Sequence, residues 1–110
     1  MTLYSQTQTE KELSKLANLV KSGQISDSLA RNIHKLVELE INQLEIDLLA
    51  TEKDLREFEG QFGMSTADFF QQWQTGQTAD NMDYTEWAAL AQMAENLRKR
   101  LYLLKGENLK

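Results

Sequence analysis

Apolar residues recur every three or four positions along almost the whole chain, a spacing typical of amphipathic helices. Nowhere do they alternate with polar residues as in a half-buried strand. Start and stop signals divide this pattern into four predicted helices. The helices are expected at residues 10–22, 26–59, 65–75 and 84–105. The sequence therefore predicts an all-α protein, with residues 10–105 as a single helical domain between flexible ends at 1–9 and 106–110.

Capping residues mark the starts of two of these helices. Thr9 and Glu12 have the spacing of a capping box, in which each side chain accepts from the other residue's backbone N–H. Ser65 and Asp68 repeat that spacing at the third helix, which ends before Gly76. The third helix is expected to fold back sharply, and the fourth to pack along the second.

The second helix determines the predicted architecture. At 1.5 Å per residue it would be about 50 Å long, whereas a compact domain of this size is only about 34 Å across. A second apolar line covers another face of its first half, formed by Leu29, Ile33, Leu36, Leu39, Ile46 and Leu49. One face can pack on helices of the same chain, and the other favours an identical helix from a second chain, antiparallel or nearly so. The candidate dimer seam follows a seven-residue repeat interrupted at Thr51: Val37, Ile41, Leu44, Leu48 and Leu55.

The stretch FGMSTADFFQQWQTG, residues 62–76, is unusually aromatic for the short segment between two helices. Gly63 allows a sharp turn with positive φ, and Ser65 restarts a helix at once. Phe69 and Trp73 are four residues apart and share a helical face. We expect this face to pack within the chain on Phe62 and Trp87. Phe70 points elsewhere and is the candidate for an exposed anchor.

Charge is distributed unevenly along the chain, whose net charge is −5. Between Arg56 and Arg98 there is no Lys or Arg, but there are seven Asp or Glu residues. Such a segment repels nucleic-acid phosphates and suits a basic protein partner. An ordinary acidic solvent face over an aromatic core fits the same pattern. The candidate partner-binding residues are Phe70, Asp80, Asp83 and Glu86.

Residues for catalysis or metal binding are scarce. The chain has no cysteine and one histidine, His34, too few ligands for a metal site. No serine has a histidine at a suitable spacing, and no glycine-rich loop precedes a lysine. The segment 12–33 has the outline of a helix-turn-helix, but its second helix offers only Arg31 and Lys35 to phosphates. The sequence thus predicts a cytoplasmic protein that is not an enzyme, needs no cofactor and does not bind nucleic acid.

Residues 55–101 resemble a motif of small all-helical prokaryotic antitoxin-like proteins. In this motif a long helix ends in Phe-Glu and meets an aromatic-Gly-Met-Ser corner and a short Phe-rich helix. A glycine, an acidic loop and a Glu-Trp-x-x-Leu helix follow. The matching positions are Phe58, Phe62, Gly63, Met64, Ser65, Phe69, Trp73, Gly76, Asp80, Asp83, Glu86, Trp87 and Leu90.

The resemblance implies a module that neutralises a small toxic protein, often a nuclease, encoded beside it. It covers less than half of the chain, and residues 1–54 carry no motif that belongs to it. An alternative is a structural or regulatory coiled-coil dimer, such as an adaptor, with no toxin partner. Both possibilities remain open from the sequence.

Overall fold

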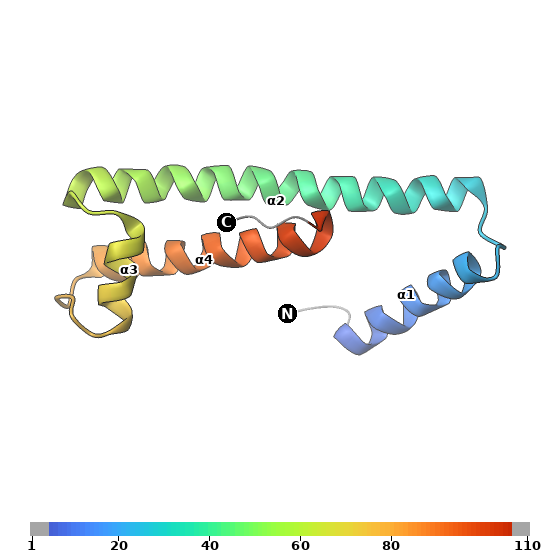
Figure 1. Cartoon of the computed structure of the whole chain (residues 1–110), viewed down its shortest axis with the longest axis horizontal. Helices are drawn as coiled ribbons and strands as arrows, with labels where there is room; N and C mark the ends of the chain where they lie inside the picture. The colour runs from blue at the N-terminus through green and yellow to red at the C-terminus, as the bar shows by residue number, and fades with distance from the viewer. Residues whose placement is uncertain (1–4, 107–110) are drawn as a thin grey trace. The chain divides into compact units, whose positions relative to one another are not determined.

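The computed structural model describes residues 5–106, which form four α-helices and no strand. These are α1 (Gln6–Lys21), α2 (Asp27–Phe62), α3 (Thr66–Gln74) and α4 (Met82–Lys105), shown in Figure 1. The predicted all-α class is confirmed, and the long second helix packs against the fourth as expected. The predictions for residues 1–4 and 107–110 lie outside the described residues.

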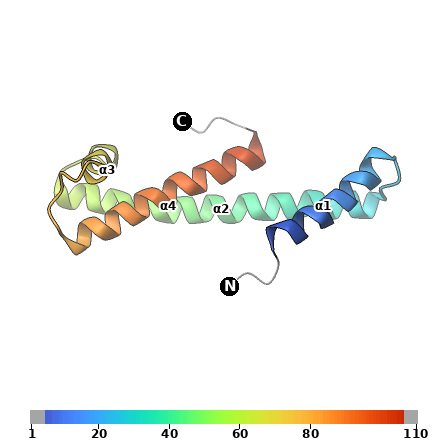
Figure 2. The same ribbon diagram turned by 90° about the horizontal axis from the view of Figure 1, so that it is seen from below.

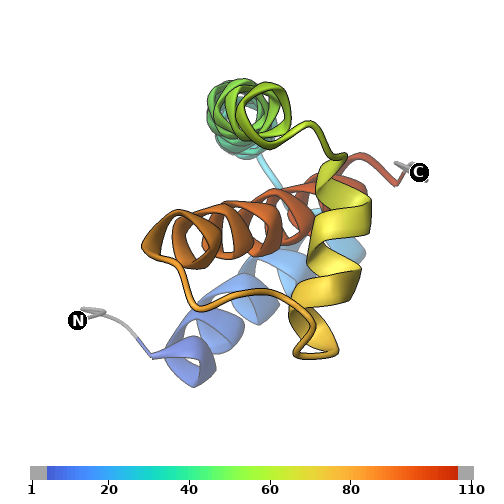
Figure 3. The same cartoon turned by 90° about the vertical axis from the view of Figure 1, so that its left-hand side faces the viewer.

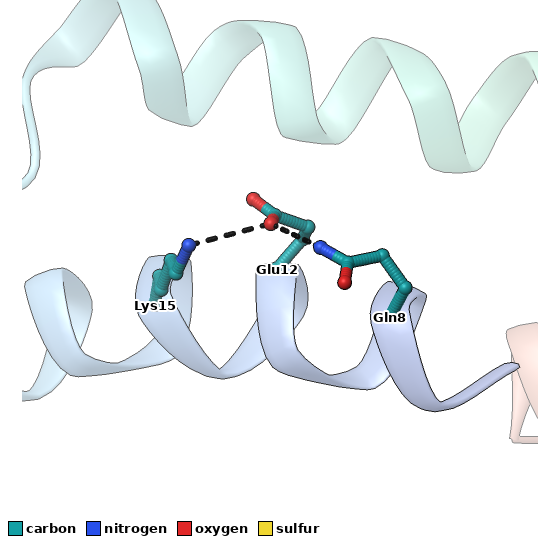
Figure 4. Close-up of polar contacts among 3 residues, drawn as sticks. All are labelled: Gln8, Glu12 and Lys15. Atoms are coloured by element: carbon teal, nitrogen blue, oxygen red, sulfur yellow. Dashed lines mark hydrogen bonds and ion pairs between the residues drawn. The ribbon is translucent and has the colours of Figure 1, made fainter. Parts of the chain in front are cut away.

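The first helix begins four residues earlier than predicted. Ser5 is its N-cap, and the Ser5 hydroxyl oxygen accepts a hydrogen bond from the backbone N–H of Gln8 at 3.1 Å. The predicted cap at Thr9 is wrong, because the Thr9 hydroxyl donates to the Ser5 carbonyl one turn back, inside the helix. Glu12 accepts instead from the Gln8 side chain at 2.8 Å and pairs with Lys15 at 3.3 Å (Figure 4). Residues 6–9, predicted to be flexible, are therefore the first turn of α1.

The chain divides into two compact units. The first extends to Leu36 and contains α1 and the first turns of α2. None of the residues of α1 is buried. Its apolar residues Leu13, Ala17 and Val20 are exposed, and Leu16 is half-buried.

The second unit begins at Val37, inside α2, and holds every buried residue among residues 5–106. Here α4 runs back along α2, and α3 lies across the end of the pair (Figures 2 and 3). One core cluster joins Leu44 to Leu97 and Leu101. The other consists of Leu55, Phe69, Trp87, Ala88, Ala91 and Ala94. The alanines of α4 are small, so the neighbouring helices can approach closely.

This packing corrects the predicted dimer seam. Leu44 and Leu55 are buried, and Ile41 and Leu48 pack against the same clusters, so these four residues face helices of their own chain. Val37, at the end of the seam, is exposed. The seven-residue repeat was read correctly as a helix-packing face, but such a repeat does not specify which chain supplies the second helix.

The residue that interrupts the seam, Thr51, is also buried. Its hydroxyl donates to the Asp47 carbonyl at 2.8 Å and lies 3.7 Å from the Met93 sulfur. The helix backbone thus supplies the hydrogen bond that a buried hydroxyl needs, so α2 tolerates a polar residue in its packing face.

Candidate protein-binding surface

The corner between α2 and α3 is built as the sequence predicted. Gly63 has φ 63°, in the left-handed region, and its N–H donates to the Glu59 carbonyl at 2.9 Å. The Ser65 hydroxyl accepts from the N–H of Asp68 at 3.1 Å. The Glu59 carboxylate accepts from the N–H of Thr66 at 2.8 Å. Two of the unpaired donors at the start of α3 are therefore satisfied, which fixes the direction of this short helix.

Trp87 is the centre of the aromatic cluster and is fully buried. Its ring stacks on Phe69 with centroids 3.9 Å apart and planes 1° apart. Phe58 and Phe62 each lie 5.7 Å from it by centroids. The indole Nε1–H donates to the Thr66 hydroxyl oxygen at 3.0 Å. The prediction that α3 closes over the junction of α2 and α4 is confirmed, and half-buried Trp73 adds to it by contacting Phe69.

Phe70 differs from its prediction as an exposed anchor. It is half-buried and packs against the same cluster as Phe69 and Trp87. Its remaining surface lines an open hollow of about 460 Å³ on the flank of α2, α3 and α4. The lining residues are Glu52, Leu55, Arg56, Glu59, Thr66, Ala67, Phe70, Ala91, Glu95 and Arg98. The sequence prediction assigned Phe70 to no packing face, because the sequence did not show that α4 lies beside this ring.

The hollow combines an apolar floor with a charged rim. Among the rim groups, Arg98 pairs with Glu52 at 3.1 Å, and Glu95 pairs with Lys99 of its own helix at 3.7 Å. The side chain of Arg56 has no hydrogen-bond or ion-pair partner within residues 5–106. Such a site can accept an apolar side chain of a protein while the rim contacts its polar neighbours. Glu52, Arg56, Glu95 and Arg98 were missed from the sequence, although their place on the flank of the α2–α4 packing face was a usable signal.

The predicted acidic residues lie at the start of α4. Asp80 is exposed in the preceding loop, and Asp83 and Glu86 are exposed neighbours one turn apart on the helix. Glu86 and Ala88 are separated by about 200° around α4, since each residue turns a helix by about 100°. Phe70 and Ala88 line a common shallow hollow, and Ala89, three residues after Glu86 and on the same side of α4, lines it too. Glu86 itself does not line this hollow and lies at its side. The four predicted residues therefore form two neighbouring surfaces, an acidic edge and the hollow beside Phe70.

His34 is exposed on α2. Within residues 5–106, no three His, Cys, Asp or Glu side chains are grouped in a way that could hold a metal ion. None of the helices in this range combines the length and apolar character needed to cross a membrane.

No known family matches this chain. Comparisons with curated proteins and with solved structures also find no match. The similarity of residues 55–101 to antitoxin-like proteins therefore stays a prediction.

The left-handed glycine at the corner allows a direct test. A Cβ atom at either Gly63 or Gly60 would meet no atom within 4 Å, but only Gly63 has positive φ. Gly63→Ala should lower the free energy of unfolding by about 1–2 kcal/mol, because an L-residue is strained in that conformation. Gly60→Ala, inside α2, should raise it by about 0.5–1 kcal/mol. Urea unfolding followed by circular dichroism measures both, and equal shifts in the two variants would contradict the assigned turn.

Proposed function

We propose that this protein is a cytoplasmic, antitoxin-like binding module of a prokaryotic cell. It neutralises a small basic toxin, of the nuclease type, by direct contact through the acidic and aromatic surface of residues 37–106. The protein itself catalyses no reaction in this proposal. The resemblance of residues 55–101 to antitoxin-like proteins suggests the class of partner.

The observation that carries the proposal is the division of charge between the two units. Residues 37–106 contain thirteen Asp or Glu and six Lys or Arg, a formal charge of −7. Residues 5–36 contain three acidic and five basic residues, a formal charge of +2. The unit that carries the aromatic cluster is thus the one whose field attracts a basic protein.

The two surfaces of this unit fit separate tasks in binding. Asp80 and Asp83 are exposed near the start of α4, where they can accelerate the approach of a basic protein. The hollow beside Phe70 offers apolar surface next to rigid helices, where a side chain of the partner can be desolvated. Charge should therefore govern the association rate, and the hollow should govern the lifetime of the complex.

Charge reversal tests the first of these tasks. Asp80→Lys combined with Asp83→Lys should slow association with the basic protein encoded next to this chain by about tenfold at low salt. It should also flatten the salt dependence of the rate, while the circular dichroism spectrum stays unchanged. Surface plasmon resonance measures the rates, and survival on co-expression measures neutralisation.

The matched control is Glu10→Lys combined with Glu12→Lys on exposed positions of α1. It changes the total charge by the same amount but lies in the other unit. If the control variant slows association as much as the Asp80→Lys, Asp83→Lys variant does, the result would contradict an acidic binding edge on α4. Failure to bind any neighbour-encoded protein would contradict the antitoxin proposal as a whole.

A second candidate function is a structural or regulatory coiled-coil dimer. It is favoured by large aliphatic residues of α2 that stay exposed on the side away from α4, Leu39, Ile46 and Leu49. Self-association without a neighbour-encoded partner would favour this candidate over the first.

A further inference from the structure

The hollow beside Phe70 lies between α2 and α4 and has a defined end on each side. At one end Arg98 of α4 meets Glu52 of α2 at 3.1 Å. At the other end α3 lies across the two helices (Figure 3), and its first N–H donates to the Glu59 carboxylate at 2.8 Å. The seven residues from Glu52 to Glu59 give the hollow a length of about 10 Å, at about 1.5 Å per residue. Its volume of about 460 Å³ is within the range of about 300–1,000 Å³ that is typical of binding sites.

The carboxylates on the rim of this hollow already have partners. Glu52 pairs with Arg98, and Glu59 accepts the first N–H of α3. Glu95, on the α4 side, pairs with Lys99 of its own helix at 3.7 Å. Among the described residues that line the hollow, each Glu side chain is therefore engaged by a donor of this chain.

The guanidinium of Arg56 is in a different state. It comes four residues after Glu52 and three before Glu59, so it lies between the two ends of the hollow. It is exposed and has no hydrogen-bond or ion-pair partner within residues 5–106. A guanidinium presents its N–H donors in a planar fork that matches the two oxygens of a carboxylate. The charge that the hollow leaves without a partner is thus positive, although residues 37–106 are acidic as a whole.

We propose that the hollow binds a segment of the partner protein in which a large apolar side chain stands beside an Asp or Glu carboxylate. The apolar side chain covers Leu55 and Phe70, and the carboxylate pairs with Arg56. This inference rests on the proposed binding function and specifies which part of the partner enters the hollow. A lysine or arginine in the same place would meet the charge of Arg56, and the carboxylates nearest to it are already engaged.

A partner can be basic overall and acidic at this one point, because the two interactions act over different distances. The field of the whole unit acts over a Debye length, about 8 Å at physiological ionic strength. A pair between Arg56 and a carboxylate forms only at hydrogen-bond distance. The acidic unit therefore determines which protein approaches, and Arg56 determines which part of its surface enters the hollow.

Selection from a library of short random peptides displayed on phage tests this chemistry, with the full chain as bait. The wild type should enrich peptides in which Asp or Glu stands next to, or one helical turn from, a large apolar residue. Arg56→Glu should lose this preference. Arg100→Glu is the matched control, because Arg100 is exposed on α4 and does not line the hollow. It should enrich the same peptides as the wild type.

The affinities of the selected peptides distinguish the guanidinium from the apolar floor. Arg56→Glu should raise the dissociation constant at least about tenfold, since it replaces attraction by repulsion, whereas Arg100→Glu should change it less than about twofold. Ala67→Phe should also raise it at least about tenfold, because a ring at this exposed position on the hollow fills the space that the peptide needs. Fluorescence anisotropy of labelled peptides measures the constants, and far-ultraviolet circular dichroism equal to that of the wild type shows that the variants are folded.

The inference would be overturned if no peptide sequence is enriched, or if the enriched peptides are rich in lysine and arginine and lack acidic residues. Acidic peptides whose affinity is unaffected by Arg56→Glu or by Ala67→Phe would overturn it as well. These results do not involve the protein encoded next to this chain, so the inference can fail while the proposed function holds. Failure of that protein to bind would contradict the proposed function and leave the peptide result unchanged.

Discussion

Trp87→Ala is expected to lower the free energy of unfolding by about 3–5 kcal/mol, the range for removing a buried aromatic ring. The indole is fully buried and stacks on Phe69, with Phe58 and Phe62 nearby. Its loss also leaves the Thr66 hydroxyl without its donor. Urea unfolding followed by circular dichroism measures the change, which should appear in the transition of residues 37–106.

Trp87→Phe is the matched control, because it keeps an aromatic ring against Phe69 and removes the indole N–H. It should cost less, about 1–2 kcal/mol, since one hydrogen bond and part of the ring surface are lost. If Trp87→Ala and the wild type unfold at the same urea concentration, the result would contradict the conclusion that the Trp87 ring is the centre of the core.

Leu44→Asp should destabilise the protein by at least about 3 kcal/mol, because it removes buried apolar volume and buries an unpaired carboxylate. Leu44 is 3% exposed and packs against Leu97 and Leu101 of α4. Ile46→Asp, two residues further along the same helix, should shift the stability of the monomer by only about 0.5 kcal/mol. Thermal and urea unfolding at low micromolar concentration compare the two variants.

These two variants distinguish folding from self-association. Leu44→Asp should lose helical signal at moderate urea concentration, whereas Ile46→Asp should stay folded and lose only its self-association. Similar stabilities for both would mean that α4 does not cover the inner face of α2.

The elements that the sequence predicted well depend on local signals. The aromatic corner needs a residue that accepts positive φ and a side chain that caps the next helix, and Gly63 and Ser65 supply these within three positions. The burial of Trp87 and Phe69 could also be predicted from the sequence, because both residues lie on apolar helical faces. The helix order and the pairing of α2 with α4 followed from the same periodicity.

The elements that could not be predicted depend on contacts between distant segments. The repeat containing Leu44 and Leu55 indicated a packing face but not that α4 of the same chain covers it. Phe70 was expected to be exposed, because nothing near it in sequence shows the neighbouring surface of α4. The apolar residues of α1 recur at the spacing of a helical packing face, yet this helix buries no residue. Periodicity identifies a face, whereas burial depends on what the folded chain brings to it.

The ion pairs between α2 and α4 have a consequence for how these two helices are aligned. Arg98 pairs with Glu52, and Lys105 pairs with Glu45, so both pairs repeat at intervals of seven residues. Because Glu38 continues the interval, a slide of α4 by one heptad would give Arg98 and Lys105 new carboxylates of the same kind. Glu59 continues the interval at the other end, so electrostatics alone is degenerate among three alignments. The indole of Trp87 removes the degeneracy, since its hydrogen bond to Thr66 forms at one position of the slide only.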